Sequence, residues 1–261
     1  MAIKGAILGD ILGSTYEFGR PKDLDWVNVP LLDEKTAHFT DDTVMTLAVK
    51  KAIIEGRDFT DTMVELGRKY PDRGYGEHFH KWFMKNDHMP YNSWGNGSAM
   101  RVSFIGEYFE DYDKIQEAAA KSAAVSHDHP EGIKGAIVTA TCIWLAKHEK
   151  SKQEIFDYVL SNYPKEEYEF SICYRLEELR DRYVWDDSCQ GTVPVAMRCF
   201  YESNDYESFI RNIYSLECDS DTFGAIAGGV AEEFYHGFGS VNADGILKEF
   251  LTDDLYEILM A

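Results

Sequence analysis

The chain has 261 residues, of which 44% are hydrophobic and 28% are charged, as in an ordinary globular protein. Its 46 acidic and 26 basic residues give a net charge of −20, which argues against nucleic-acid and anionic-membrane partners because such a chain repels phosphate. The five cysteines contain no C-x-x-C pair, and the start of the chain is unlike a signal peptide. No apolar stretch approaches the roughly 20 residues of a membrane span. These three observations predict a cytoplasmic protein.

The first segment carries glycines at every fourth position. The spacing of Gly5, Gly9 and Gly13 places all three on one face of a helix. Glycine within a helix costs stability, so such a face marks either close helix packing or close approach of the backbone to a ligand. We favour helix packing here.

Helical periodicity dominates the rest of the chain, and convincing period-2 strands are absent. Apolar residues recur at helical spacing over residues 45–53, 133–145 and 223–235, with Gly56 and Gly237 placed to end the first and last of these helices. Capping-box spacing predicts two further helix starts, Ser151 with Glu154 and Asn204 with Glu207. No linker or repeat divides the chain, so the sequence predicts one all-α domain over residues 1–261 with about ten helices.

Two acidic blocks share one layout: TDDT (residues 40–43) and DSDT (residues 219–222) each precede a strongly apolar helix. One such block is commonly a helix cap, but a cap needs a single side-chain oxygen and each block supplies at least three. Unneeded carboxylates beside an apolar helix repel one another unless a cation lies among them, and oxygen-only ligands favour Mg²⁺ or Mn²⁺. From the pattern alone, the cap and metal interpretations both stay open.

These blocks are part of an ordered set that spans nearly the full chain. The set resembles the ADP-ribosylglycohydrolase family, and its seven members together make a specific match. They are GAILGDILGSTYEF (5–18), FTDDT (39–43), GYG (74–76), SWGNGSAMRV (93–102), SHDHPEGIKGA (126–136), CQGTVP (189–194) and DSDTFGAIAGG (219–229).

The resemblance implies a compact all-α domain with a binuclear centre of two Mg²⁺ or Mn²⁺ ions between helices. It implies a metal-dependent glycosidase that cleaves the bond between ADP-ribose and an acceptor, with arginine-linked ADP-ribose as the expected substrate and an ADP-ribosylated protein or small molecule as the partner. Glu17 and Asp41 are the expected catalytic groups at the attacking water. The implied metal ligands are Thr40, Asp41, Asp42, Asp219, Asp221 and Thr222.

The same resemblance implies a substrate pocket. SWGNGSAMRV has the composition of a phosphate cradle at a helix start, since glycines let backbone N–H groups approach an anion. Trp94 would lie against the adenine, and His127 near the phosphates or ribose, whereas His129 would only orient the following helix. Arg101 could pair with phosphate or hold the acidic network. The implied substrate-binding residues are Gly76, Ser93, Trp94, Gly95, Asn96, Gly97, Met100 and His127.

One departure from the family pattern leaves alternatives open. Glu217 and Cys218 stand where the family has small residues, and the carboxylate could crowd the metal centre, add a ligand or point outward. A non-catalytic ADP-ribose-binding module is therefore an alternative function. A less favoured one is an all-α metal-dependent phosphohydrolase built around His127 and Asp128.

Overall fold

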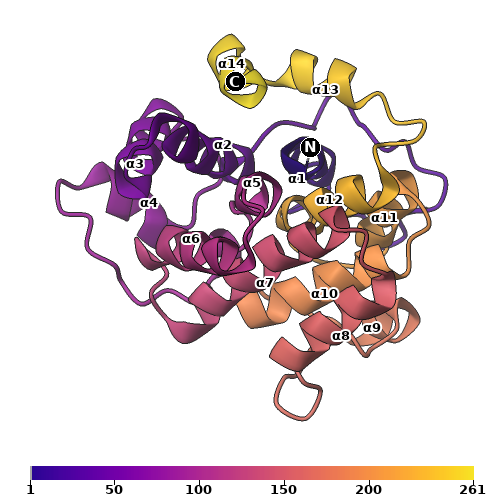
Figure 1. Cartoon of the computed structure of the whole chain (residues 1–261). Helices are drawn as coiled ribbons and strands as arrows, with labels where there is room; N and C mark the ends of the chain where they lie inside the picture. Colours follow the sequence, from indigo (N-terminus) through magenta and orange to yellow (C-terminus); the bar gives the residue numbers. More distant parts are fainter. Residues whose placement is uncertain (1) are drawn as a thin grey trace.

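The computed structural model describes residues 2–261, which form fourteen α-helices and one 3₁₀ helix, with no strand within that range (Figure 1). The predicted all-α class is confirmed. The number of helices exceeds the predicted ten because several have only six to eight residues, too short to show a convincing apolar period.

The helices follow one another along the chain, and most connections are short, except residues 14–40, 85–95 and 163–175. Their bounds are α1 (Ala2–Gly13), α2 (Asp41–Glu55), α3 (Phe59–Lys69), α4 (Glu77–Met84), η1 (Asn96–Ser98), α5 (Ser103–Tyr108), α6 (Tyr112–Ala124), α7 (Pro130–Lys147), α8 (Lys152–Asn162), α9 (Leu176–Arg182), α10 (Cys189–Tyr201), α11 (Tyr206–Tyr214), α12 (Ser220–Tyr235), α13 (Ala243–Phe250) and α14 (Asp253–Met260). No helix among residues 2–261 is both long and apolar enough to cross a membrane.

The glycine face of α1 packs directly on α12, as predicted, and the two helices lie side by side near the centre of the molecule (Figure 1). A Cβ atom at Gly9 would lie 2.2 Å from the carbonyl oxygen of Gly224, so the backbones touch without side chains between them. The helices run antiparallel, and the hydroxyl of Ser220 donates to the Gly13 carbonyl at 2.6 Å. This contact brings the end of α1 to the start of α12.

A buried aspartate of α1 fixes the start of α2. Asp10 is completely buried and accepts hydrogen bonds from the backbone N–H groups of Thr40 and Thr43, both at 3.0 Å. Both threonine hydroxyls donate to the same carboxylate. The starts of α2 and α12 are therefore held at one end of α1.

The predicted helix ends are correct in two cases and wrong in two. Gly56 ends α2 in the left-handed conformation (φ 64°), and Ser151 with Glu154 forms the predicted capping box of α8. Helix α11, however, is capped by Asp205, one residue after Asn204, because the Asp205 carboxylate accepts the N–H of Ser208 at 2.7 Å. Helix α12 ends through His236, whose φ is 56°, one residue before the predicted Gly237.

Candidate functional site

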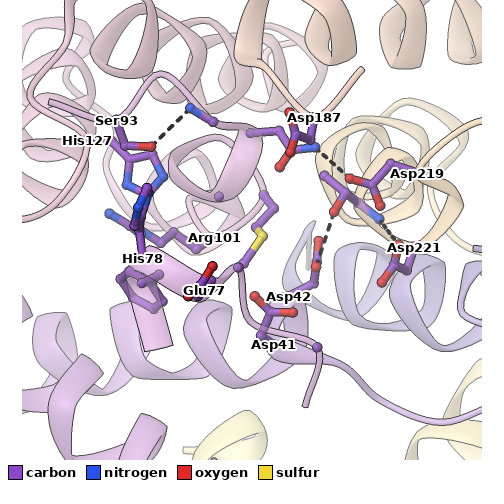
Figure 2. Close-up of a pocket in the computed structure, with 18 of the residues that line it drawn as sticks. Asp41, Asp42, Glu77, His78, Ser93, Arg101, His127, Asp187, Asp219 and Asp221 are labelled. Atoms are coloured by element: carbon purple, nitrogen blue, oxygen red, sulfur yellow. Dashed lines mark hydrogen bonds between the residues drawn. The ribbon is translucent and has the colours of Figure 1, made fainter. Parts of the chain in front are cut away.

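The starts of α2 and α12 and the segments that follow α1 and precede α10 enclose a cavity of about 500 Å³ (Figure 2). The residues that line it are Glu17, Phe18, Asp41, Asp42, Gly74, Gly76, Glu77, His78, Phe79, Tyr91, Ser93, Gly95, Asn96, Gly97, Met100, Arg101, His127, Trp185, Asp187, Asp219, Asp221 and Thr222. Thirteen of the fifteen residues that the sequence predicted for the site are among them; the two others are Thr40 and Trp94.

Three carboxylates from the two sides of the α1–α12 contact converge in this cavity. Glu17, Asp219 and Asp221 each place an oxygen within 4.8 Å of the others. Burial and the charge of Asp219 raise the pKa of Glu17 to about 8, and burial together with Asp219 raises the pKa of Asp221 well above its usual range. Such a group favours a bound proton or a bound cation over three free negative charges.

The first acidic block faces the same centre. Burial, and next the charge of Asp10, raise the pKa of both Asp41 and Asp42 well above the usual range. The hydroxyl of Thr222 donates to Asp42 Oδ2 at 3.3 Å, which joins the two blocks across 180 residues of chain. The other oxygen, Asp42 Oδ1, is buried without a hydrogen-bond partner within the described part of the chain.

These observations fit a hard divalent cation. The converging donors are carboxylate and hydroxyl oxygens, the set that Mg²⁺ and Mn²⁺ prefer. The unpartnered oxygen of Asp42 would gain a ligand bond, and the like charges of Glu17, Asp219 and Asp221 would gain a counter-charge. Asn96 holds Asp219 in place by donating to its Oδ2 atom at 2.7 Å.

Thr40 occupies a different position from the other predicted ligands. Its hydroxyl donates to Asp10 Oδ1 at 2.8 Å and accepts the N–H of Asp42 at 3.3 Å, so Thr40 is the N-cap of α2. The cap interpretation is therefore correct for Thr40. The carboxylates of Asp41 and Asp42 are therefore not needed for the cap.

Gly74 lets the chain pass close to Asp41. Its φ of +92° lies in the region that side-chain-bearing residues avoid, and a Cβ atom there would lie 3.3 Å from Asp41 Oδ1. The neighbouring Arg73 carbonyl accepts the Asp41 N–H at 2.7 Å. The G-Y-G loop thus forms a wall of the cavity beside the first acidic block, and Gly76 lines it as predicted.

The SWGNGSAMRV segment forms the opposite wall, but the expected helix start is only the single 3₁₀ turn of η1. The N–H groups of Gly95 and Asn96 are already donated, to Ser93 Oγ at 3.2 Å and to the Asp187 carbonyl at 2.7 Å. Gly97 faces the imidazole of His127, with 3.3 Å from a Cβ atom there to Nε2. This wall therefore presents an imidazole and small residues to the cavity, and not the row of free N–H groups found at a helix start.

The imidazole of His127 forms part of this wall, in surroundings that disfavour its charged form. Burial, and next the nearby Arg101, lower the pKa of His127 well below its usual value. Its Nδ1 atom is 2.8 Å from Ser126 Oγ, which leaves Nε2 toward Gly97 and the cavity. His129, as predicted, caps α7 by accepting the N–H of Glu131 at 3.1 Å.

Trp94 stands at the rim instead of lining the cavity. It is 51% exposed, and its ring centroid lies 5.4 Å from that of His129. Glu217 is exposed and lies outside the cavity wall, so of the three possibilities for this residue the structure shows the outward-pointing one.

Sequence reasoning missed several residues of the cavity. Arg101 was left between two roles, and it is a fully buried guanidinium whose Nη2 atom donates to the Ser122 carbonyl at 2.7 Å. Phe18, Trp185 and Asp187 lacked any pattern to mark them, except that Phe18 follows Glu17. Asp10 does not line the cavity but anchors the start of α2, and it did carry a signal, since it is a lone carboxylate inside an apolar helical segment.

Comparisons with known proteins agree with this geometry. A family model described as ADP-ribosylglycohydrolase matches residues 1–243. The ADP-ribosylhydrolase ARH3 of Homo sapiens is 32% identical over 185 residues, which cover 59% of this chain and 51% of that protein. The chain therefore spans about half the length of this relative. ARH3 of Xenopus tropicalis is 24% identical over 302 residues, covering 90% and 86% of the two chains.

The fold is also similar to that of a solved structure titled "ADP-ribosylglycohydrolase-related protein complex". That likeness has a TM-score of 0.75 and a sequence identity of 20%, and it covers 98% of this chain and 93% of the other. At this identity the comparison concerns the fold.

Proposed function

Since the chain belongs to the ADP-ribosylglycohydrolase family, we propose that it hydrolyses the glycosidic bond between ADP-ribose and an acceptor, with arginine-linked ADP-ribose as the substrate. The observation that carries this proposal is the meeting of the two acidic blocks in one cavity, opposite a wall that holds Arg101 and His127. The substrate has matching parts, a diphosphate and a ribose with vicinal hydroxyls.

In this proposal Asp41, Asp42, Asp219, Asp221 and Thr222 of the two acidic blocks would hold two Mg²⁺ or Mn²⁺ ions, with Glu17 beside them. Such ions supply Lewis acidity toward substrate oxygens and a lower pKa for water. Thr40 supports the centre indirectly, since its hydroxyl anchors the start of α2 on Asp10.

The chain's own carboxylates then serve the hydrolysis. Glu17 follows α1 on a turn and faces Asp219 and Asp221. There it would orient water toward C1″ of the ribose and take its proton as the C1″–N bond breaks, and the departing guanidino nitrogen would take up a proton in return. Asp41 is the second candidate for this role. Hydrolysis passes through an oxocarbenium-like state, which the surrounding negative charge favours.

The opposite wall would hold the rest of the ADP-ribose. Arg101 brings the one Lys or Arg side chain among the described residues of the cavity wall, and its Nε atom is buried without a partner in the described structure. A diphosphate would supply the missing counter-charge. His127 and Gly97 are placed for the same group, and Trp94 at the rim suits the adenine.

The two alternatives have less support. A binding module without catalysis was suggested by Glu217, which lies outside the cavity wall. A phosphohydrolase built on His127 and Asp128 needs both side chains at the centre, but Asp128 Oδ1 accepts the backbone N–H of Asn92 at 2.6 Å. The five cysteines are all free, which supports the further proposal that the protein works in the reducing cytoplasm.

The test is release of ADP-ribose from defined conjugates. Wild-type protein with MgCl₂ or MnCl₂ should cleave an ADP-ribosyl-arginine peptide, and a chelator or Asp221→Asn should lower the rate roughly a hundredfold or more. Cleavage of p-nitrophenyl phosphate without cleavage of any conjugate would favour the phosphohydrolase. Binding of ADP-ribose without turnover of any conjugate would favour the non-catalytic module.

A further inference from the structure

The cavity has two chemically different ends. Arg101, His78 and His127 lie toward one end, and Asp187, Asp219 and Asp221 toward the other (Figure 2). Seven carboxylates but a single guanidinium line the cavity as far as residues 2–261 describe it, namely Glu17, Asp41, Asp42, Glu77, Asp187, Asp219 and Asp221, with Arg101. An anionic diphosphate is attracted to the first end, so the group attached at C1″ would be directed toward the acidic end.

A stacked aromatic pair in the cavity wall is linked to this acidic end by sequence, since Phe18 follows Glu17 and Trp185 lies two residues before Asp187. The rings of Phe18 and Trp185 stack with centroids 5.7 Å apart and an angle of 23° between their planes. Both residues line the cavity, yet Phe18 is 82% exposed and Trp185 is 40% exposed. Phe18 directly follows Glu17, so the aromatic surface begins beside the carboxylate that would act at C1″.

Asp187 adds a carboxylate to the cavity wall on the same segment as Trp185. It is two residues from Trp185, it lines the cavity, and its charge is among the causes that raise the pKa of Asp219. Its backbone carbonyl accepts the Asn96 N–H at 2.7 Å. An isolated antiparallel β-bridge between Gly95 and Ser188 holds the same segment in place. The carboxylate is therefore carried by a fixed stretch of backbone that a change of its side chain would leave in place.

We propose that Phe18, Trp185 and Asp187 form the acceptor subsite and select a planar guanidinium, the group that an arginine acceptor presents. This inference rests on the proposed function and names the residues behind its acceptor preference. A guanidinium can stack on an indole or phenyl face and at the same time give two N–H donors to a carboxylate. A neutral hydroxyl acceptor such as serine gains neither interaction.

Two measurements test the subsite, one of which does not depend on turnover. Isothermal titration with agmatine, in the presence of ADP-ribose and MgCl₂, measures guanidinium binding directly. Asp187→Asn and Trp185→Ala should each weaken agmatine binding about tenfold. Phe18→Ala tests the other ring of the same aromatic surface. Val184→Ala is the control, because Val184 is a 63% exposed neighbour outside the cavity wall, and it should leave agmatine binding unchanged.

The second measurement compares substrates. The kcat/KM for an ADP-ribosyl-arginine peptide should fall about tenfold in Asp187→Asn and Trp185→Ala, while that for an ADP-ribosyl-serine peptide changes less than about twofold. Affinity for ADP-ribose alone should stay at the wild-type value in both variants.

The outcomes separate the two proposals. If wild-type protein cleaves no conjugate but agmatine binding responds to the variants, the hydrolase proposal fails and the guanidinium subsite stands. If agmatine does not bind, or binds equally to wild type and all variants, the subsite is refuted whatever the enzyme cleaves. An equal fall for both peptides would also overturn it, since the residues would then serve the reaction generally.

Discussion

At the scale of single residues, the threonine and the two aspartates at the start of the first acidic block have different roles. Thr40 caps α2 and is itself held by Asp10, so the helix start is complete without Asp41 or Asp42. The half-buried Asp41 and the buried Asp42 are nevertheless placed in a mutually repulsive group, and one oxygen of Asp42 has no partner in the described structure. A bound cation would offset both the repulsion between the carboxylates and the missing partner of the Asp42 oxygen, whereas a helix cap explains neither.

Asp41→Asn tests this division directly. We expect Mn²⁺ binding, measured by titration calorimetry, to be lost and turnover to fall roughly a hundredfold. In chelated protein the midpoint of thermal unfolding should equal or exceed that of wild type, because the amide removes a repelling charge.

The matched control for this variant is Asp253→Asn. Asp253 is also the first residue of a helix, α14, that follows a threonine N-cap, but it lies away from the cavity. It should leave metal binding and turnover unchanged. Full activity of Asp41→Asn would exclude Asp41 from the catalytic centre.

At the scale of elements, the α1–α12 contact sets the distance between the two acidic blocks. Gly9 and Gly224 touch through their backbones, and Gly13 meets Ser220, next to Asp219 and Asp221. The separation of the helix axes therefore decides whether carboxylates of both blocks can reach one centre. A helix pair separated by ordinary side chains would lie farther apart.

Gly9→Ala should disturb this spacing. Its methyl group would meet the Gly224 carbonyl, a backbone atom that cannot rotate away, so we expect a loss of at least about 2 kcal/mol in the free energy of unfolding. Urea denaturation measures the loss. Gly19→Ala is the control, because nothing lies within 4 Å of a Cβ atom there. Equal stability of the two variants would contradict the tight contact.

At the scale of the whole molecule, stability should depend on pH through a carboxyl group away from the cavity wall. Glu232 is buried in α12, and its Oε2 atom accepts the Gly5 N–H of α1 at 2.6 Å. Burial raises the pKa of Glu232 from 4.5 to about 7. Between these values the folded chain binds more protons than the unfolded chain, so stability falls as pH rises through this window.

Glu232→Gln keeps an oxygen acceptor for Gly5 but cannot ionise. Relative to wild type it should therefore gain up to roughly 3 kcal/mol as the pH rises from 4.5 to 7, with no further gain above that. Urea unfolding across the window measures this difference. Glu177→Gln, on an exposed helix surface, is the control, and its stability should vary with pH as that of wild type does. If the stability of Glu232→Gln also varied with pH in parallel to wild type, this would contradict the raised pKa of Glu232.

The sequence predicted the architecture wherever it carried a repeated local pattern. The glycine face of α1, the end of α2 at Gly56 and the capping box at Ser151 are of this kind. It failed at Asn204, because two adjacent residues could both cap, and the capping box joins Asp205 with Ser208 instead of Asn204 with Glu207. Short helices such as α9 escaped notice because one or two turns show no period.

Residues of the candidate site could likewise be predicted only where a local sequence pattern marks them. Asp42 and Asp221 could be predicted because compact blocks surround them, whereas Trp185 and Asp187 reach the cavity only through the fold. We propose that residues 1–261 form one domain, as the sequence indicated. Helix α14 packs on α2, and the Tyr70 hydroxyl at the end of α3 donates to Asp254 of α14 at 2.6 Å. Both contacts support this proposal.

The α1–α12 contact also bears on how the protein acquires its structure during synthesis. Helix α1 leaves the ribosome some 200 residues before its partner α12, so its glycine face and Asp10 stay uncovered during that interval. A contact of such long sequence separation forms late and slows folding. The nascent chain should therefore need protection from aggregation until α12 has emerged, and fragments that end before α12 should fail to bind metal.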